Sequence, residues 1–183
     1  MSNCEKLYIF NPDTDMALGS NCHNYTPPIN IQNFIRKLAL LPALYAKNDS
    51  SILLPYGLNR FDACNLAYYD VVKSKNIKLV IDDDLTNKSF YIIPWGWDET
   101  LCNRLSRKGI IAVDTQNNIL DFNKLCRVRK ELSHRRISIE IHKLLFHYLG
   151  DTGIKIPIEF SDSDAALNWV AKNSGCYLKS PWS

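Results

Sequence analysis

Glycine is scarce in this chain. Only 7 of the 183 residues are glycine, which is about 4% against the usual ~7%. Glycine-rich loops cradle phosphates in many nucleotide-binding enzymes, because the backbone there must approach the ligand closely. A complete enzyme with several such loops is therefore hard to fit into this sequence. At about 150 residues per domain, the length corresponds to one domain or to one domain and part of another.

Long apolar runs are also missing. The longest, 38–46, is interrupted by Pro42 and is shorter than the about 20 residues that span a bilayer. The N-terminus lacks the basic region and apolar stretch of a secretory signal. With 46% hydrophobic and 22% charged residues, the chain has the composition of a globular protein. The sequence predicts a cytoplasmic protein without a membrane partner.

Closely spaced cysteines are absent. The 6 cysteines are scattered with no Cys-x-x-Cys pair, which favours free thiols in a reducing compartment over disulfides or a zinc site. The nearest approach to a metal pair is Cys22-His23, and adjacent residues in a loop are a weak signal. The acidic run Asp82–Asp84 lacks the spacing and glycine of a calcium loop, which favours a solvated turn. No metal site is predicted.

A strong charge imbalance is missing too, since the formal net charge is only +3. One local exception is the segment Lys124–Arg136, which contains 6 basic residues and the single acid Glu131. This shift in composition predicts a boundary between two domains, 1–122 and 123–183. A nucleic-acid patch is the alternative, and it is disfavoured because no RNA-type aromatic motif accompanies the basic residues.

Apolar β-type runs alternate with helical patterns before residue 122. The predicted strands are Lys6–Phe10, Ser51–Leu54, Ile77–Ile81, Phe90–Ile93 and Ile110–Val113. The predicted helices between them are Ile31–Ala46, with a kink at Pro42, then Asp62–Ser74 and Asp98–Lys108. This alternation predicts an α/β fold with a Rossmann-like, mainly parallel sheet.

The later segment has a different pattern. Apolar residues recur on one helical face from Ser133 to Gly150, and a capped helix is predicted for Ser161–Asn173. A final strand is predicted for Cys176–Lys179. We therefore expect an α+β subdomain after the boundary.

The loop Asn11–Asp15 directly follows the first predicted strand. Ligands of open parallel sheets bind outside the carboxyl ends of the strands. Asn11, Asp13 and Asp15 are therefore candidate substrate-binding residues, with the carboxylates suited to an amine, a hydroxyl or a cation. The alternative is an Asn-Pro turn whose acids cap the next segment.

Aromatic residues follow another strand end. The rings of Trp95 and Trp97 are candidates to line a pocket, with core packing or a rigid turn as the alternative. Tyr25 and His23, in the loop after the first strand, are weaker candidates of the same kind.

Four short segments after residue 132 occur in a recognisable order: Ser133-His134-Arg135, Gly153-Ile154-Lys155-Ile156-Pro157, Ser163-Asp164-Ala165-Ala166 and Leu178-Lys179-Ser180-Pro181. In this order and spacing they resemble the opening of the ATP-grasp module, the nucleotide-binding unit of carboxylate–amine ligases and biotin-dependent carboxylases. The resemblance implies that Arg135, Lys179 and Ser183 contact ATP. Two cations at a helix start and a strand end suit a triphosphate. The alternatives are a solvated basic face for Arg135 and an edge-strand lysine for Lys179.

The chain as a whole also resembles a narrower group. The segments are Asn11–Leu18, Asn24–Pro28, Pro94–Trp97, Leu132–Arg136 and Lys179–Ser183. Together they resemble a family of uncharacterised bacterial ATP-grasp-like proteins found chiefly in Bacteroidota. This resemblance implies a Rossmann-like pre-ATP-grasp domain followed by an incomplete ATP-grasp subdomain.

The resemblance also implies an activity for the parent protein. It would be an ATP-dependent ligase that activates a carboxylate as an acylphosphate and joins it to an amine or a similar nucleophile, with ATP and magnesium as cofactors. The family's magnesium ligands, adenine-binding linker and lid correspond to positions after Ser183, so we expect these 183 residues alone to be inactive. An unpaired edge at Cys176–Lys179 would favour a homodimer. The alternative is a non-catalytic α/β module that binds a small ligand or a partner.

Overall fold

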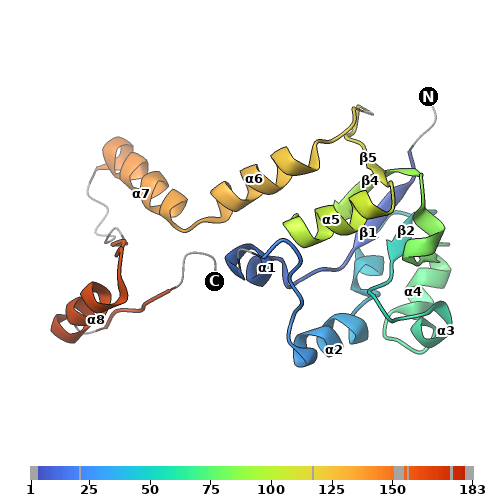
Figure 1. The fold of residues 1–183 in the computed structure, drawn as a ribbon, viewed down its shortest axis with the longest axis horizontal. Coiled ribbons are helices and arrows are strands. Elements are labelled where there is room, and N and C mark those ends of the chain that lie inside the picture. Colours follow the sequence, from blue (N-terminus) through green and yellow to red (C-terminus); the bar gives the residue numbers. More distant parts are fainter. Residues whose placement is uncertain are drawn as a thin grey trace. The chain divides into compact units, whose positions relative to one another are not determined.

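The computed structural model describes residues 4–20, 22–116, 118–150, 155, 157–173 and 175–179. The chain divides into two compact units, Met1–Val128 and Arg129–Ser183. The first unit contains the sheet, and the described part of the second is helical (Figure 1). Among the described residues, no helix combines the length and the apolar character that a membrane span requires.

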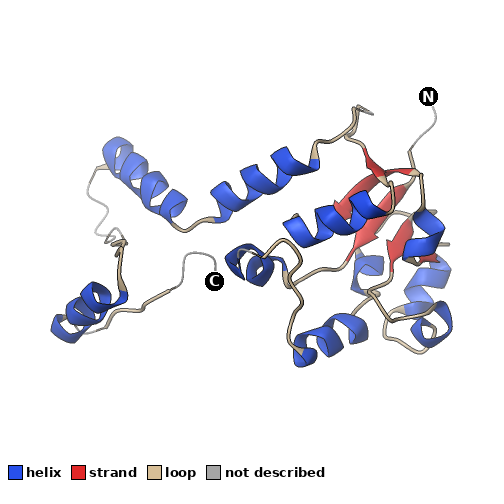
Figure 2. Cartoon of the chain, viewed as in Figure 1, coloured by secondary structure: helices blue, strands red, loops and turns tan. Residues whose placement is uncertain are grey.

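A parallel sheet forms the centre of the first unit (Figure 2). Its strands are β1 (Lys6–Ile9), β2 (Ser51–Leu53), β3 (Lys78–Val80), β4 (Ser89–Pro94) and β5 (Ile111–Ala112). The 5 strands lie in the order β3-β2-β1-β4-β5, and each neighbouring pair is parallel. In the central register, Tyr8 is paired with Ile52 on one side and Ile93 on the other. The predicted α/β fold with a parallel sheet is confirmed.

Helices connect the strands of this unit. They are α1 (Thr14–Ser20), α2 (Ile29–Lys37), the 3₁₀ helix η1 (Leu41–Leu44), α3 (Arg60–Ala63), α4 (Tyr69–Ser74), the 3₁₀ helix η2 (Asp82–Leu85), α5 (Glu99–Arg107) and α6 (Phe122–Ser133). The last of these begins at the predicted boundary after residue 122 and crosses the division between the two units.

Apolar side chains cover both faces of the sheet. Successive strand residues point to opposite faces, so Leu7 and Ile9 enter one core cluster while Tyr8 enters another. The first cluster includes Leu101 and Leu105 of α5. The second includes residues of η1, α3 and α4. Because both faces are buried, the strands are short apolar runs, as is typical of parallel sheets.

Two predicted helices are divided in the structure. The expected helix Ile31–Ala46 ends at Lys37 and resumes as η1 with Pro42 in its first turn, because proline has no N–H to continue the α-helical ladder. The expected helix Asp62–Ser74 is divided into α3 and α4, and Tyr68 between them has a left-handed φ of 71°.

The acidic run Asp82–Asp84 is not the solvated turn that its composition predicts. It forms η2, and its carboxylates are paired with cations of other elements. The pairs are Asp82 with Arg104 (2.9 Å), Asp83 with Lys108 (2.8 Å) and Asp84 with Arg60. The run therefore ties η2 to α5 and α3.

The described part of the second unit contains α7 (Arg136–Leu149) and α8 (Ser163–Lys172). Both predicted helices are confirmed, with Gly150 ending α7 at a φ of 73° and Asp162 capping α8. The predicted strand Cys176–Lys179 is wrong. A strand needs a hydrogen-bonded neighbour, and within the part of the chain that the structure describes this segment has none. The edge on which the predicted homodimer depends is therefore not a strand here.

Candidate functional site at the ends of β1 and β4

The strand order reverses between β1 and β4. From β1 the chain crosses to β2 on one side, whereas β4 lies on the other side. Ligands of open α/β sheets bind in the crevice outside the carboxyl ends of the strands at such a point. The predicted loop Asn11–Asp15 leaves β1 but is shorter than expected, because α1 begins at Thr14 and holds Asp15 in its first turn, and the segment Trp95–Trp97 leaves β4. The fold therefore brings together two sequence motifs that lie more than 80 residues apart.

Hydrogen bonds join the two loops directly. The Asn11 Nδ2 donates to the Gly96 carbonyl oxygen (2.7 Å) and to Asp98 Oδ2 (3.1 Å), and the Gly96 N–H donates to Asn11 Oδ1 (3.3 Å). The Thr14 hydroxyl also donates to Asp98 Oδ2 (3.0 Å). The side chain of Asn11 is thus engaged in holding the loops together, and its predicted contact with a substrate stays a prediction.

Asp98 is the centre of this network. It caps α5, where its Oδ1 accepts a hydrogen bond from the Leu101 N–H (2.9 Å), and only 4% of the residue is exposed. The sequence indicates the cap because Asp98 precedes a helical pattern. The sequence does not show that Asp98 also accepts hydrogen bonds from Thr14 and Asn11, because these residues lie 84 and 87 positions earlier.

Gly96 allows the two loops to approach closely. A Cβ at this position would lie 2.4 Å from Thr14 Cγ2 and 2.8 Å from Thr14 Oγ1, closer than real Cβ contacts. The glycine between Trp95 and Trp97 is therefore required by packing against α1.

Asp13 is the half-buried carboxylate at this edge. Burial is the main cause that raises its pKa, the negative charge of Asp98 raises it further, and a backbone hydrogen bond opposes the shift. Asp15 is exposed. Asp13 is therefore a carboxylate whose charge is only partly compensated by the protein, which favours a ligand that brings a positive charge.

Tyr25 belongs to the same edge of the sheet. Its N–H donates to Thr100 Oγ1 of α5 (2.8 Å). The pKa of its phenol is raised by burial and by the charge of Asp13. The structure thus places the predicted residues Tyr25 and Asp13 in one electrostatic environment.

The two tryptophans differ in their surroundings. Trp95 is 52% exposed and meets the ring of Phe10 edge-on at 5.5 Å. Trp97 packs against the core cluster under α5 and against Phe122 at 5.8 Å. Trp95 is accessible to a ligand, whereas the environment of Trp97 is that of core packing.

The loop 22–28 is fastened to α5 beside this site. His23 is paired with Glu99, and the His23 carbonyl oxygen accepts a hydrogen bond from Asn103 Nδ2 (2.7 Å). Arg107 donates to Asn24 Oδ1 (2.6 Å). These contacts hold Tyr25 near the ends of β1 and β4. Within the described residues, no three His, Cys, Asp or Glu side chains form a group suited to a metal ion.

The candidates for ATP contact lie in the second unit. Arg135 is the residue before α7, and Lys179 is exposed. Ser183 lies outside the described residues. Their predicted contacts with ATP stay predictions.

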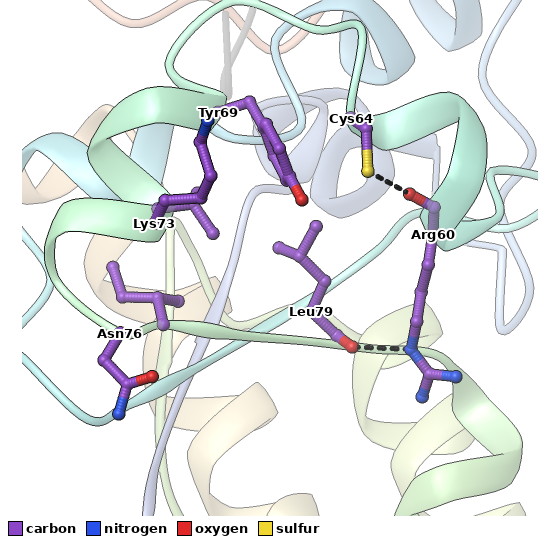
Figure 3. A pocket seen from close by; sticks show the side chains of 8 residues that line it. Arg60, Cys64, Tyr69, Lys73, Asn76 and Leu79 are labelled. Carbon is purple, nitrogen blue, oxygen red and sulfur yellow. Dashed lines mark hydrogen bonds between the residues drawn. The ribbon is translucent and has the colours of Figure 1, made fainter.

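A shallow hollow of about 360 Å³ lies elsewhere in the first unit, beside β3 (Figure 3). Its lining residues are Arg60, Cys64, Tyr69, Val72, Lys73, Asn76, Ile77 and Leu79. Two of its polar groups are occupied by the protein, because Arg60 Nε donates to the Leu79 carbonyl oxygen (2.8 Å) and Lys73 is paired with Asp70 (2.9 Å). It lies at the far edge of the sheet from the point where the strand order reverses, and we take the β1/β4 edge as the candidate site.

Comparison of the chain with protein-family models, with curated proteins and with solved structures finds no match.

Proposed function

We propose that the chain is the N-terminal part of an ATP-dependent ligase of the ATP-grasp type, which activates a carboxylate as an acylphosphate and joins it to an amine. Two observations support this proposal. The order of short segments after residue 132 resembles the opening of an ATP-grasp module. The strand order of the parallel sheet before them reverses between β1 and β4, and open α/β sheets bind small molecules at such a point.

One observation carries the substrate part of this proposal. Asp13 follows β1 and lies close enough to Tyr25 for its charge to raise the pKa of the Tyr25 phenol, while the exposed ring of Trp95 follows β4. Asp15 adds an exposed carboxylate in the first turn of α1. Negative charge beside aromatic surface suits a cationic amine, because the ring faces and the carboxylates attract the same charge. A phosphate would be repelled there. We therefore assign the amine substrate, rather than ATP, to the first unit.

The nucleotide is assigned to the second unit. Arg135 stands at the start of α7, where helix N–H groups and the helix dipole favour an anion. Lys179 adds a second, exposed cation. These residue types fit a triphosphate. Bound ATP would supply the phosphoryl group that activates the carboxylate, while Arg135 and Lys179 would neutralise and orient the phosphates.

The decisive experiment uses the product of the complete reading frame. It should release ADP only when Mg-ATP, a carboxylate and an amine are all present. Lys179→Ala should weaken ATP binding at least about tenfold without changing the binding of amines. The matched control is Lys172→Ala, a lysine at the end of α8. ATP turnover by the 183-residue chain alone, or equal effects of both substitutions, would contradict the proposal.

A second candidate is a non-catalytic module that binds a small amine. The network of Asn11, Thr14 and Asp98 favours it, since these polar groups bond one another and serve to shape the loops. Titration of the chain with putrescine and with acetate, followed by NMR, distinguishes the two functions when combined with the ATP assay. Binding of putrescine without any ATP-dependent reaction of the complete protein would favour the module.

A further inference from the structure

Two cysteines of the first unit lie in direct contact. The Sγ atoms of Cys102 on α5 and Cys126 on α6 are 2.7 Å apart and share a hydrogen bond. This separation exceeds the length of a disulfide bond by only about 0.7 Å. Both residues are free thiols in the structure. The other cysteines lie far from this pair in sequence, at positions 4, 22, 64 and 176.

The helices hold the pair in place from both sides. Cys102 is 4% exposed, its N–H donates to the Asp98 carbonyl oxygen (3.1 Å), and its thiol lies 3.9 Å from the Phe122 carbonyl oxygen. The Phe122 ring at the start of α6 packs against Trp97. These contacts keep the start of α6 beside α5, so the two cysteines stay neighbours in the folded unit.

The two thiols differ in exposure and in ionisation. Cys126 is half-buried, so small reagents reach it more readily than they reach Cys102. The hydrogen bond between the thiols lowers the pKa of Cys126, and the same bond, with burial, raises the pKa of Cys102. Thiolates are the reactive form in thiol–disulfide exchange. Cys126 is therefore the sulfur that attacks first.

We propose that Cys102 and Cys126 form a redox-active pair, a modification site that closes to an intramolecular disulfide on reaction with a low-molecular-weight disulfide such as oxidised glutathione.

The chemistry takes place in two exchange steps. The Cys126 thiolate attacks one sulfur of oxidised glutathione, forming a mixed disulfide and releasing one glutathione thiolate, which takes up the proton that Cys126 lost. The Cys102 sulfur then attacks the Cys126 sulfur, passes its proton to the second departing glutathione and completes the Cys102–Cys126 bond. Overall, two protein thiols are oxidised and one glutathione disulfide is reduced to two thiols.

The bond would fix the first two turns of α6 against α5. Asp98 and Trp97, at the base of the candidate site, are the immediate neighbours of this contact. The oxidised state would therefore hold the start of α6 to α5 by a covalent bond.

The test uses the reduced 183-residue chain, incubated with oxidised and reduced glutathione, quenched with acid, alkylated and digested with trypsin. Mass spectrometry then searches for the peptide Ser89–Arg104 joined to the tripeptide Leu125–Arg127. We expect this linked product to exceed any other cysteine pair at least about tenfold in the native chain, because contact gives the pair a high effective concentration. In urea the preference should vanish.

Two variants sharpen the result. Cys126→Ser should abolish the link and leave Cys102 reduced, whereas Cys64→Ser, which removes an exposed thiol on the same unit, should leave the link unchanged. Glutathione attached to Cys126 without the link, or the same mixture of pairs in native buffer and in urea, would overturn the proposal. The wild-type measurement decides the question even if Cys126→Ser does not fold.

Discussion

The two units of this chain bury their apolar residues to very different extents. In the first unit, two core clusters enclose the sheet, and Leu7, Ile52 and Leu105 are fully buried. In the described part of the second unit, Ala166 is the one buried apolar residue, whereas the apolar face of α7 is exposed, with Leu144 at 59%. Most helical stability comes from packing an apolar face. The sheet unit therefore has a source of stability that the described helices of the second unit lack.

The largest expected difference between the units concerns a leucine. Leu105→Ala on α5 empties a fully buried site, so it should lower the free energy of unfolding by about 3 kcal/mol. Leu144→Ala on α7 removes an exposed side chain and should change it by less than about 0.5 kcal/mol. Urea unfolding followed by far-UV circular dichroism measures both. Equal losses would mean that α7 is covered in solution and that the contrast does not hold.

Helix caps provide the next comparison. Asp98 and Asp162 both cap a helix through a side-chain oxygen, at 2.9 Å and 2.7 Å from the N–H they accept from. Asp98→Ala also leaves the buried Thr14 hydroxyl without its acceptor and removes one of the two acceptors of Asn11 Nδ2, so it should cost about 2–3 kcal/mol. Asp162→Ala at an exposed cap should cost about 1 kcal/mol or less.

The same urea unfolding measurements test these two variants. The test is which of the two variants loses more free energy of unfolding. If Asp162→Ala cost more than Asp98→Ala, the buried network at the ends of β1 and β4 would contribute little to stability.

A smaller effect is expected where the two site loops touch. Gly96→Ala would place a methyl group 2.4 Å from Thr14 Cγ2 and should destabilise the first unit by about 1–3 kcal/mol. Thr14→Ala removes part of the clash, so the double variant should be more stable than the sum of the single losses predicts. Thermal unfolding of the wild type, the two single variants and the double variant gives the coupling free energy between Gly96 and Thr14. Simple additivity would show that the loops separate in solution.

Much of the sheet could be predicted from sequence, because its strands are short apolar runs that end at proline or polar residues. The position of Asn11 and Asp13 at the carboxyl end of β1 followed from the same pattern. Helix α1 was missed because its 7 residues include a glycine and three polar residues, which leaves too short an apolar pattern to predict a helix. The apolar periodicity of the sequence gave no sign of α6 either, because none of the residues of this helix is buried.

The site itself was predictable only in part. Single residues such as Asp13 and Trp95 follow from their position after a strand. The role of Asp98 depends on β1 and β4 being neighbours, and strand order cannot be read from local patterns. The contact between Cys102 and Cys126 is hidden for the same reason, since 24 positions separate them. Long-range pairing is thus what the sequence alone did not show.

The smallest expected effect concerns the charge of Asp13. Its pKa in the folded chain is raised, mainly by burial, above the about 3.9 of an unfolded chain. Between these two values the folded state binds more protons than the unfolded state. The free energy of unfolding therefore decreases as the pH rises through this window, and this loss of stability persists at neutral pH. Asp13→Asn should remove this loss of stability, because asparagine carries no charge, and should stabilise the chain by about 0.5 kcal/mol at pH ~7.

Thermal unfolding between pH ~3 and ~8 measures this difference, with the exposed acid Asp15 in the first turn of α1 changed to asparagine (Asp15→Asn) as the matched control. The gain of Asp13→Asn over the wild type should appear as the pH rises and be absent at the acidic end, while the control should follow the wild type throughout. Under the proposed function, the same variant should bind putrescine more weakly, because the carboxylate that lowers the stability is the one that would attract the amine. A variant that loses stability at neutral pH would show instead that the Asp13 charge is compensated within the protein, which would remove the electrostatic reason for assigning an amine to this edge.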